Sequence, residues 1–168
     1  MIPFDSERSD VEALVQVALA ELRSDEMLFR LHANERSITH RLAVYLEQPF
    51  NGWNVDCEYS RIGEDPSNYK RLLLPTAANV NHFDMNGSRV YPDIVIHHRG
   101  QNTTSDNLFV IEVKTVWSQV SDEQDFNKLK AFTGQYSVDQ FVTYRFGLFL
   151  KFNEKGEVAE SQRFESKV

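Results

Sequence analysis

The sequence predicts an α/β (α+β) fold whose elements follow the order helix, three strands, helix, strand. Apolar residues recur at helical spacing in the first fifty residues, whereas four later segments alternate like strands or form continuous hydrophobic runs. The chain has 168 residues, of which 41% are hydrophobic and 26% are charged, a balance typical of one globular domain. We therefore expect residues 1–168 to form a single domain with one site.

Two helices are expected before the first strand. Apolar residues recur at helical spacing from Asp10 to Leu31, with an interruption near Asp25. A second helix should run from Asn34 to Gln48, because Asn34 is a favourable N-terminal cap. The first segment is interpreted as an N-terminal extension that packs on the core.

Turn-forming clusters divide the rest of the chain. Four hydrophobic segments are expected to be strands, and a helix is expected between the last two. The strands are 53–59, 90–98, 108–116 and 144–152, and the helix is 121–134. The predicted regions are an N-terminal helical extension (1–33), a core (34–152), an insertion within that core (60–89) and a polar tail (153–168).

Composition limits the location and the partners. Cys57 is the single cysteine, and the N-terminus lacks the basic and apolar regions of a secretory signal. Charges interrupt every hydrophobic run before the roughly 20 apolar residues that cross a bilayer, so we expect a cytoplasmic protein with no membrane partner. The formal net charge of −7 opposes a surface that binds nucleic acid throughout, although carboxylates that hold a divalent cation would contribute to that charge.

Three charged residues lie in or beside hydrophobic strands. Asp93 opens the hydrophobic part of segment 90–98, and Glu112 and Lys114 share one face of segment 108–116. Burial of these side chains costs desolvation free energy unless they are paired, hydrated or bound to a metal. An ordinary ion pair between Glu112 and Lys114 is one explanation. The position of Asp93 favours a second explanation, a catalytic site. Two acids on adjacent strands can hold Mg²⁺ for phosphodiester hydrolysis, and an ammonium group beside them can stabilise the developing charge.

The spacing of these residues also resembles a known family. Pro92-Asp93, followed after eighteen residues by Glu112-Val113-Lys114, resembles the motif of the PD-(D/E)XK nuclease superfamily. The resemblance covers about residues 34–152 and implies a restriction-endonuclease-like α-β-β-β-α-β core with a central mixed sheet flanked by helices. It implies catalytic roles for Asp93, Glu112 and Lys114. It also implies that Mg²⁺, with Mn²⁺ as an alternative, is held by Asp93, Glu112 and the carbonyl oxygen of Val113.

Glu35 is the candidate fourth member of this site. It has the same helical phase as Ile38 and Leu42, which are expected to face the core. A carboxylate in the first helical turn is also favoured by the helix dipole, so Glu35 could simply stabilise the end of the helix. In the superfamily, a glutamate from the helix before the first core strand often joins the site. The resemblance therefore implies that Glu35 is a catalytic residue and a metal ligand.

Other polar residues are weaker candidates. Phosphate contacts are considered for four basic residues, although isolated basic side chains are more often solvated. These residues are Lys70, Arg71, His97 and Arg99. Zinc is disfavoured because His97 and His98 lack a second pair of ligands at zinc spacing.

Three further patterns are interpreted as structural or accidental. Lys128 and Lys130 are expected on a solvated face of their helix. Glu58 ranks below Glu35 as a ligand, because an outward polar residue is usual on a half-exposed sheet. Gln140 and Tyr144 have the spacing of the Gln-x-x-x-Tyr element found in some nucleases of the RecB type, a match that easily arises by chance.

The favoured function is a metal-dependent nuclease that hydrolyses phosphodiester bonds, as a DNA endonuclease of restriction, repair or defence type. The alternative is a catalytically silent nuclease-like domain that binds a protein or nucleic-acid partner, which the acidic charge favours. A third hypothesis, an acidic mimic of nucleic acid, gives no reason for Glu112 and Lys114 within an apolar strand. The absence of a Gly-rich phosphate loop and of a G-x-S-x-G elbow disfavours nucleotide-driven and acyl-transfer chemistry. DNA versus RNA, specificity, endo versus exo action, pathway and a possible homodimer stay open.

Overall fold

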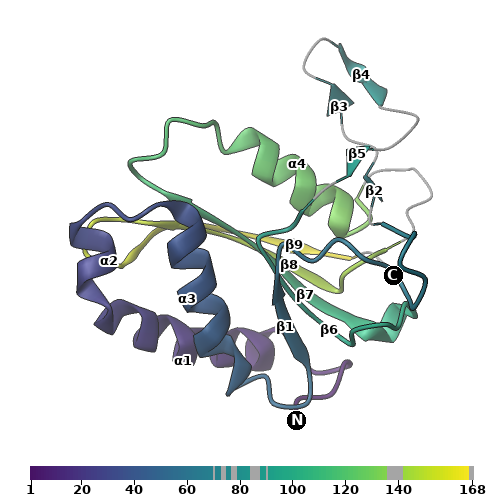
Figure 1. Cartoon of the computed structure of the whole chain (residues 1–168), viewed down its shortest axis with the longest axis horizontal. Helices are drawn as coiled ribbons and strands as arrows, with labels where there is room; N and C mark the ends of the chain where they lie inside the picture. Colours follow the sequence, from purple (N-terminus) through teal and green to yellow (C-terminus); the bar gives the residue numbers. More distant parts are fainter. Residues whose placement is uncertain are drawn as a thin grey trace.

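A mixed sheet lies at the centre of the protein, with helices on both faces (Figure 1). The computed structural model describes residues 1–69, 71–72, 75–76, 79–83, 88–89, 91–135 and 142–166. The five strands of the sheet are β1 (Asn54–Cys57), β6 (Ile94–His97), β7 (Asn107–Thr115), β8 (Phe146–Phe152) and β9 (Val158–Glu165). They are ordered β1-β6-β7-β8-β9, and all neighbours are antiparallel except the parallel pair β7 and β8. The expected α/β class, with a mixed sheet flanked by helices, is confirmed.

The helices form two unequal layers. Figure 1 shows the N-terminal helices on one side of the sheet and the helix between β7 and β8 on the other. The first three are α1 (Arg8–Ser24), α2 (Glu26–Arg30) and α3 (Glu35–Glu47), and the opposite helix is α4 (Glu123–Phe132). A short 3-10 turn, η1 (Thr104–Asp106), leads into β7. In chain order, the sheet and its core helices therefore read α3, β1, β6, β7, α4, β8 and β9.

Side-chain hydrogen bonds stabilise the junction between α1 and α2 and the N-terminus of α3. The helical pattern breaks at Asp25, as expected, and its carboxylate accepts hydrogen bonds from Arg41 Nε (3.0 Å) and Tyr45 Oη (2.7 Å) of α3. Asn34 caps α3 by accepting a 2.8 Å hydrogen bond from the backbone N–H of Ser37. The Asp25 contacts fix the middle of α3 against the end of α1, and the Asn34 cap fixes its first turn.

The central strand β7 is buried on both faces. The β7 side chains that pack with α1 and α3 include Phe109, Ile111 and Val113. Val110 packs instead with Leu129 and Phe132 of α4. Because side chains alternate along a strand, Glu112 and Lys114 share the phase of Val110 and face α4.

Two regions contain strands that the sequence analysis did not locate. In its described part, the insertion 60–89 contains two short antiparallel pairs, β2 (Arg71–Leu72) with β5 (Ser88–Arg89) and β3 (Pro75–Thr76) with β4 (Asn79–Phe83). The segment 153–168, predicted as a polar tail, contributes the edge strand β9, which the sequence analysis did not predict. Seven of the eight β9 residues are exposed and Phe164 alone is buried, so the strand shows no apolar alternation in the sequence.

Candidate active site

Glu112 and Lys114 are both buried, but they do not pair with each other. Glu112 is fully buried, and Lys114 is 5% exposed. Each side chain finds its partner on α4 instead. Lys114 Nζ lies 2.9 Å from Asp125 Oδ2, and Glu112 Oε2 pairs with the ammonium group of Lys128. The simple explanation of a Glu112–Lys114 ion pair is therefore wrong.

Asp93 joins this group from the neighbouring strand. It lies directly before β6, and its Oδ2 accepts a 2.7 Å hydrogen bond from the backbone N–H of Val113 in β7. Burial raises the pKa of Asp93, an effect that the positive charge of Lys128 and the Val113 hydrogen bond partly offset. Burial also raises the pKa of Glu112 well above its ordinary value, and the negative charge of Asp93 adds to that increase. Asp93 and Glu112 are therefore electrostatic neighbours.

The structure adds Asp125 and Lys128 to the predicted residues. The expectation that Lys128 lies on a solvated helical face was wrong, because its ammonium group contacts Glu112 and lies 3.2 Å from Asp125 Oδ1. Asp125 is buried and bridges the two lysines of the cluster, Lys114 and Lys128. We define the acid–lysine cluster as Asp93, Glu112, Lys114, Asp125 and Lys128.

The sequence contained a signal for these two residues. Asp125, Lys128, Leu129 and Phe132 stand at positions i, i+3, i+4 and i+7, which share one face of a helix. Leu129 and Phe132 are the apolar members of this face and pack in the core, so the same phase turns Asp125 and Lys128 inward. What the sequence did not contain was the position of Glu112 and Lys114 beneath that face.

The acid–lysine cluster is incompletely neutralised. It contains three carboxylates and two ammonium groups, so it has one excess negative charge when all five are ionised. Glu112 Oε1 is buried and has no hydrogen-bond partner among the described residues. A buried carboxylate oxygen without a partner carries a desolvation cost that a bound cation would offset.

Glu35 approaches Asp93 from the opposite helical layer. Its Oε1 accepts hydrogen bonds from the backbone N–H of Thr115 (3.2 Å) and from Thr115 Oγ1 (3.4 Å). Glu35 and Asp93 line the same pocket, of about 400 Å³. The remaining residues of this pocket are Arg36, Thr39, His40, Cys57 and Glu58. Glu35 therefore reaches Asp93 from the α3 side, and Asp93 lies within electrostatic reach of both Glu35 and the α4 residues Asp125 and Lys128.

The four expected metal ligands do not form a ready-made cage. Within the part of the chain that the structure describes, no three His, Cys, Asp or Glu side chains are grouped so that they could hold a metal ion. Glu35 accepts hydrogen bonds from Thr115, and Val113 donates its N–H to Asp93. Asp93 and Glu112 remain the two acids whose ionised forms are least well compensated.

Three other pocket residues have ordinary roles. Glu58 Oε1 pairs with Arg36 Nε at 2.8 Å, and both side chains are exposed. Desolvation and the neighbouring charges of Asp93, Glu58 and Asp56 raise the pKa of the Cys57 thiol to about 11. The thiol is therefore protonated at neutral pH and is a poor nucleophile.

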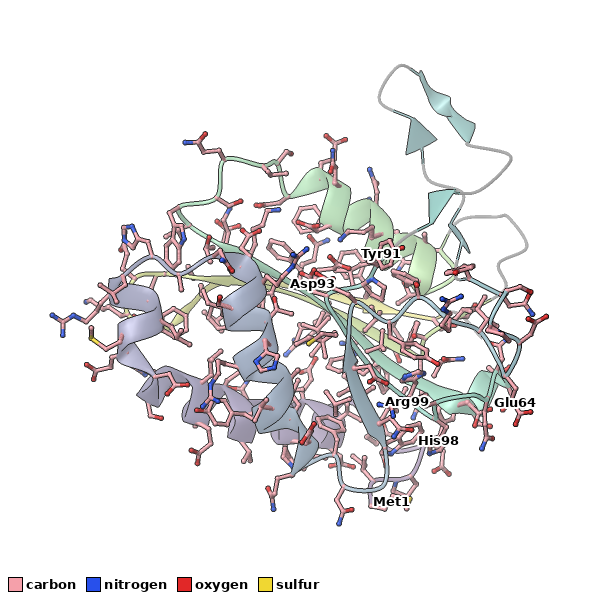
Figure 2. All side chains as sticks on the ribbon, in the orientation of Figure 1. Met1, Glu64, Tyr91, Asp93, His98 and Arg99 are labelled. Carbon is pink, nitrogen blue, oxygen red and sulfur yellow. The ribbon has the colours of Figure 1, made fainter. Side chains whose placement is uncertain are left out.

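The predicted phosphate-binding residues are not brought to the acid–lysine cluster. Lys70 lies outside the described residues, and so does the side chain of Arg71. Figure 2 shows Asp93 at one end of β6 and Arg99 beyond the other end. Both Arg99 and the buried His97 contact Asp56, with Arg99 Nη2 2.5 Å from Asp56 Oδ1 and His97 Nε2 3.0 Å from Asp56 Oδ2.

The remaining candidates are also separate from the cluster. The two adjacent histidines contact different acids, since His98 Nδ1 lies 3.1 Å from Asp106 Oδ1. The ring of His98 stacks on Trp53 with a centroid distance of 4.1 Å. Gln140 lies outside the described residues, and Tyr144 is fully buried.

Comparisons with protein-family models, with curated proteins and with solved structures give no match for this chain. None of the helices in the described residues is long and apolar enough to cross a membrane.

Proposed function

We propose that this protein is a metal-dependent nuclease of the PD-(D/E)XK superfamily that hydrolyses phosphodiester bonds. The observation that carries the proposal is the fully buried Glu112, which has one unpartnered oxygen and lies beside a second acid, Asp93. Strongly perturbed carboxylates that share a site are typical of functional centres. The order α3, β1, β6, β7, α4, β8, with β7 parallel to β8, supports the restriction-endonuclease-like core that the motif implies.

The donor set is compatible with Mg²⁺, and with Mn²⁺ as an alternative. Mg²⁺ prefers oxygen ligands and usually keeps several waters, so one or two protein carboxylates are sufficient. Asp93 and Glu112 would supply those carboxylates, with the carbonyl oxygen of Val113 and the carboxylate of Glu35 as further ligands implied by the resemblance. When bound, such an ion acidifies a coordinated water and neutralises charge on the phosphate.

Lys114 supplies a positioned ammonium group. Its side chain is nearly fully buried and lies on the same face of β7 as Glu112. The Lys114 Nζ atom is 2.9 Å from Asp125 Oδ2 of α4. A positioned cation in a site that excludes water stabilises negative charge more strongly than it would in bulk solvent. We assign Lys114 to stabilisation of the charge that develops on the phosphate. Asp125 is a positioning residue that acts through Lys114.

Glu35 completes the proposed site from α3. Its Oε1 is held by Thr115, and it faces the pocket that Asp93 also lines. A carboxylate in this position can accept a proton from an attacking water. Cys57 lines the same pocket, but its raised pKa makes it unsuitable as a base or nucleophile.

The proposed substrate is DNA, cut internally by an enzyme of restriction, repair or defence type, as the resemblance implies. A location in the cytoplasm and a homodimer stay predictions. The second candidate function is a catalytically silent domain that binds a protein or a nucleic acid. The Lys128–Glu112 ion pair favours it, because that pair partly neutralises the cluster without any metal.

A cleavage assay separates the two functions. The purified protein is incubated with supercoiled plasmid, linear single-stranded DNA and RNA, each with Mg²⁺, Mn²⁺ or chelator. We expect cation-dependent cleavage by the wild type and none by Asp93→Asn or Glu112→Gln. Cys57→Ser, a change in the same pocket, is the matched control and should cut normally. If the wild type cuts none of these substrates with either cation, the nuclease proposal is wrong and the binding domain replaces it.

A further inference from the structure

We propose that Lys128 competes with the divalent cation for Glu112, so that cation binding releases the Lys128 ammonium group to contact the nucleic acid. This inference rests on the proposed function and adds a coupling between its two ligands. The acid–lysine cluster provides three observations that support it, namely the position of Lys128, its second partner and the charge of the whole cluster.

The first observation is that the Lys128 ammonium group pairs with Glu112, a proposed ligand of the cation. Its ammonium group contacts Glu112 Oε2, while Glu112 Oε1 has no hydrogen-bond partner among the described residues. The Lys128 side chain is 18% exposed, whereas Glu112 is fully buried. Lys128 is therefore the member of the pair that reaches solvent. A cation that takes the Glu112 carboxylate must replace the charge compensation that Lys128 supplies.

The second observation is that Lys128 has another partner after displacement. Asp125 Oδ1 lies 3.2 Å from Lys128 Nζ, one helical turn earlier on α4. Loss of Glu112 would therefore not leave a buried ammonium group without an anion, which would be costly. Asp125 also holds Lys114 at 2.9 Å, so the two lysines share one anchor. After displacement, Asp125 would be the one carboxylate that pairs with both Lys114 and Lys128, so one positive charge would be available to a phosphate.

The third observation is the sign of the total charge. With three carboxylates and two lysines ionised, the cluster has one excess negative charge and repels phosphate. A bound divalent cation reverses the excess of these five residues to one positive charge, and it leaves the site neutral when the nearby Glu35 carboxylate is counted as well. Coupling of this kind is reciprocal, so the cation should strengthen nucleic-acid binding by the same factor by which nucleic acid strengthens cation binding.

The first experiment measures Mn²⁺ binding by titration calorimetry at about pH 8, which favours ionised carboxylates. Lys128→Met removes the competing ammonium group, and we expect it to bind Mn²⁺ about tenfold more tightly than the wild type, which corresponds to about 1.4 kcal/mol. Lys130→Met is the matched control, because it removes the same charge from the same helix outside the cluster. Its Mn²⁺ affinity should equal that of the wild type.

The second experiment measures DNA binding in chelator and in Ca²⁺, with a fluorescent duplex as the probe. The wild type and Lys130→Met should bind DNA more tightly in Ca²⁺ than in chelator, whereas Lys128→Met should lose most of that gain. If Lys128→Met proves unstable without metal, Mn²⁺ should raise its melting temperature more than that of the wild type. That measurement gives the same answer on the competition.

The outcomes distinguish this inference from the proposed function. Equal or weaker Mn²⁺ binding by Lys128→Met, together with wild-type binding that Asp93→Asn weakens, overturns the competition and leaves the nuclease site intact. Failure of the wild type to bind Mn²⁺ at millimolar concentration overturns both proposals. An unchanged Ca²⁺ gain in Lys128→Met overturns the assignment of Lys128 to the nucleic acid.

Discussion

Each end of β6 has a charged cluster, and the pKa values of the acids in the two clusters shift in opposite directions. At the start of the strand, burial raises the pKa of Asp93 and of its neighbour Glu112. At the end of the strand, burial also acts on Asp56, but hydrogen bonds from His97 and Arg99 outweigh it and lower the pKa of Asp56 to about 2. One cluster disfavours its own ionised acids, and the other stabilises its acid.

The difference separates a structural cluster from a candidate functional one. Asp56 is matched by two donors, so its charge contributes to stability and needs no further ligand. Glu112 and Asp93 share Lys128 and retain an unmatched charge, which a cation could neutralise. The sequence analysis considered His97 and Arg99 as phosphate ligands. In the structure both side chains contact Asp56, and we assign them a structural role.

The largest expected effect is on cleavage. Lys114→Met should reduce Mg²⁺-dependent cleavage about 10²-fold to 10³-fold, because it removes a positioned charge from the transition state. Arg99→Ala should leave the cleavage rate within about twofold, because Arg99 contacts Asp56 at the other end of β6. A factor of ten in rate corresponds to about 1.36 kcal/mol of activation free energy, so the two variants are easily distinguished. Single-turnover kinetics under saturating enzyme measure both. Equal losses in the two variants would contradict the separation of the clusters.

The next largest effect is on stability at the structural end. The pKa of Asp56 is about 2 in the folded protein, against 3.8 for an unperturbed aspartate, so its ionisation stabilises the fold. That stabilisation is complete above 3.8 and is lost as the pH falls towards 2. Asp56→Asn should therefore lower the unfolding free energy by about 2 kcal/mol at neutral pH, at 1.36 kcal/mol per pKa unit. Urea unfolding at several pH values should show this deficit shrinking in acid.

The pH dependence should have the opposite sign at the functional end. The pKa of Glu112 in the folded protein lies above its ordinary 4.5, so the folded state binds the proton more tightly than the unfolded state. Wild-type stability from this group then falls as the pH rises above 4.5. Glu112→Gln cannot titrate, so its stability relative to the wild type should increase over the same range. A difference that is flat or reversed would show that Lys128 fully compensates Glu112.

The smallest effect is expected at Arg99. Its side chain is 53% exposed, and Asp56 keeps its hydrogen bond with His97 when Arg99 is removed. Exposed ion pairs contribute about 0.2 to 1 kcal/mol, so Arg99→Ala should destabilise the protein by about 0.5 kcal/mol. Thermal unfolding in low and high salt measures this effect, which added salt should reduce. A loss as large as that of Asp56→Asn would mean that Arg99, rather than His97, dominates the cluster.

The local features of this protein were accessible from its residue order. Asn34 marked the start of α3, and the apolar runs located β7 and β8 to within two residues of their ends. The alternation along β7 put Glu112 and Lys114 on one face, as the structure has them. Such features depend on local backbone geometry. Residues that share one face recur with a period of 2 in a strand and 3.6 in a helix, so the pattern of apolar residues can be read directly in the sequence.

The partners of the charged residues depended on packing between elements far apart in the chain. Periodicity gave the phase of Lys128 on α4, but only the placement of α4 over β7 brings its ammonium group to Glu112. The same holds for Asp56, which meets His97 and Arg99 because β1 pairs with β6. The edge strand β9 was missed because its side chains are mostly exposed and its stability comes from hydrogen bonds with β8. Cross-element contacts of this kind have no fixed spacing along the chain, so they follow from the tertiary arrangement alone.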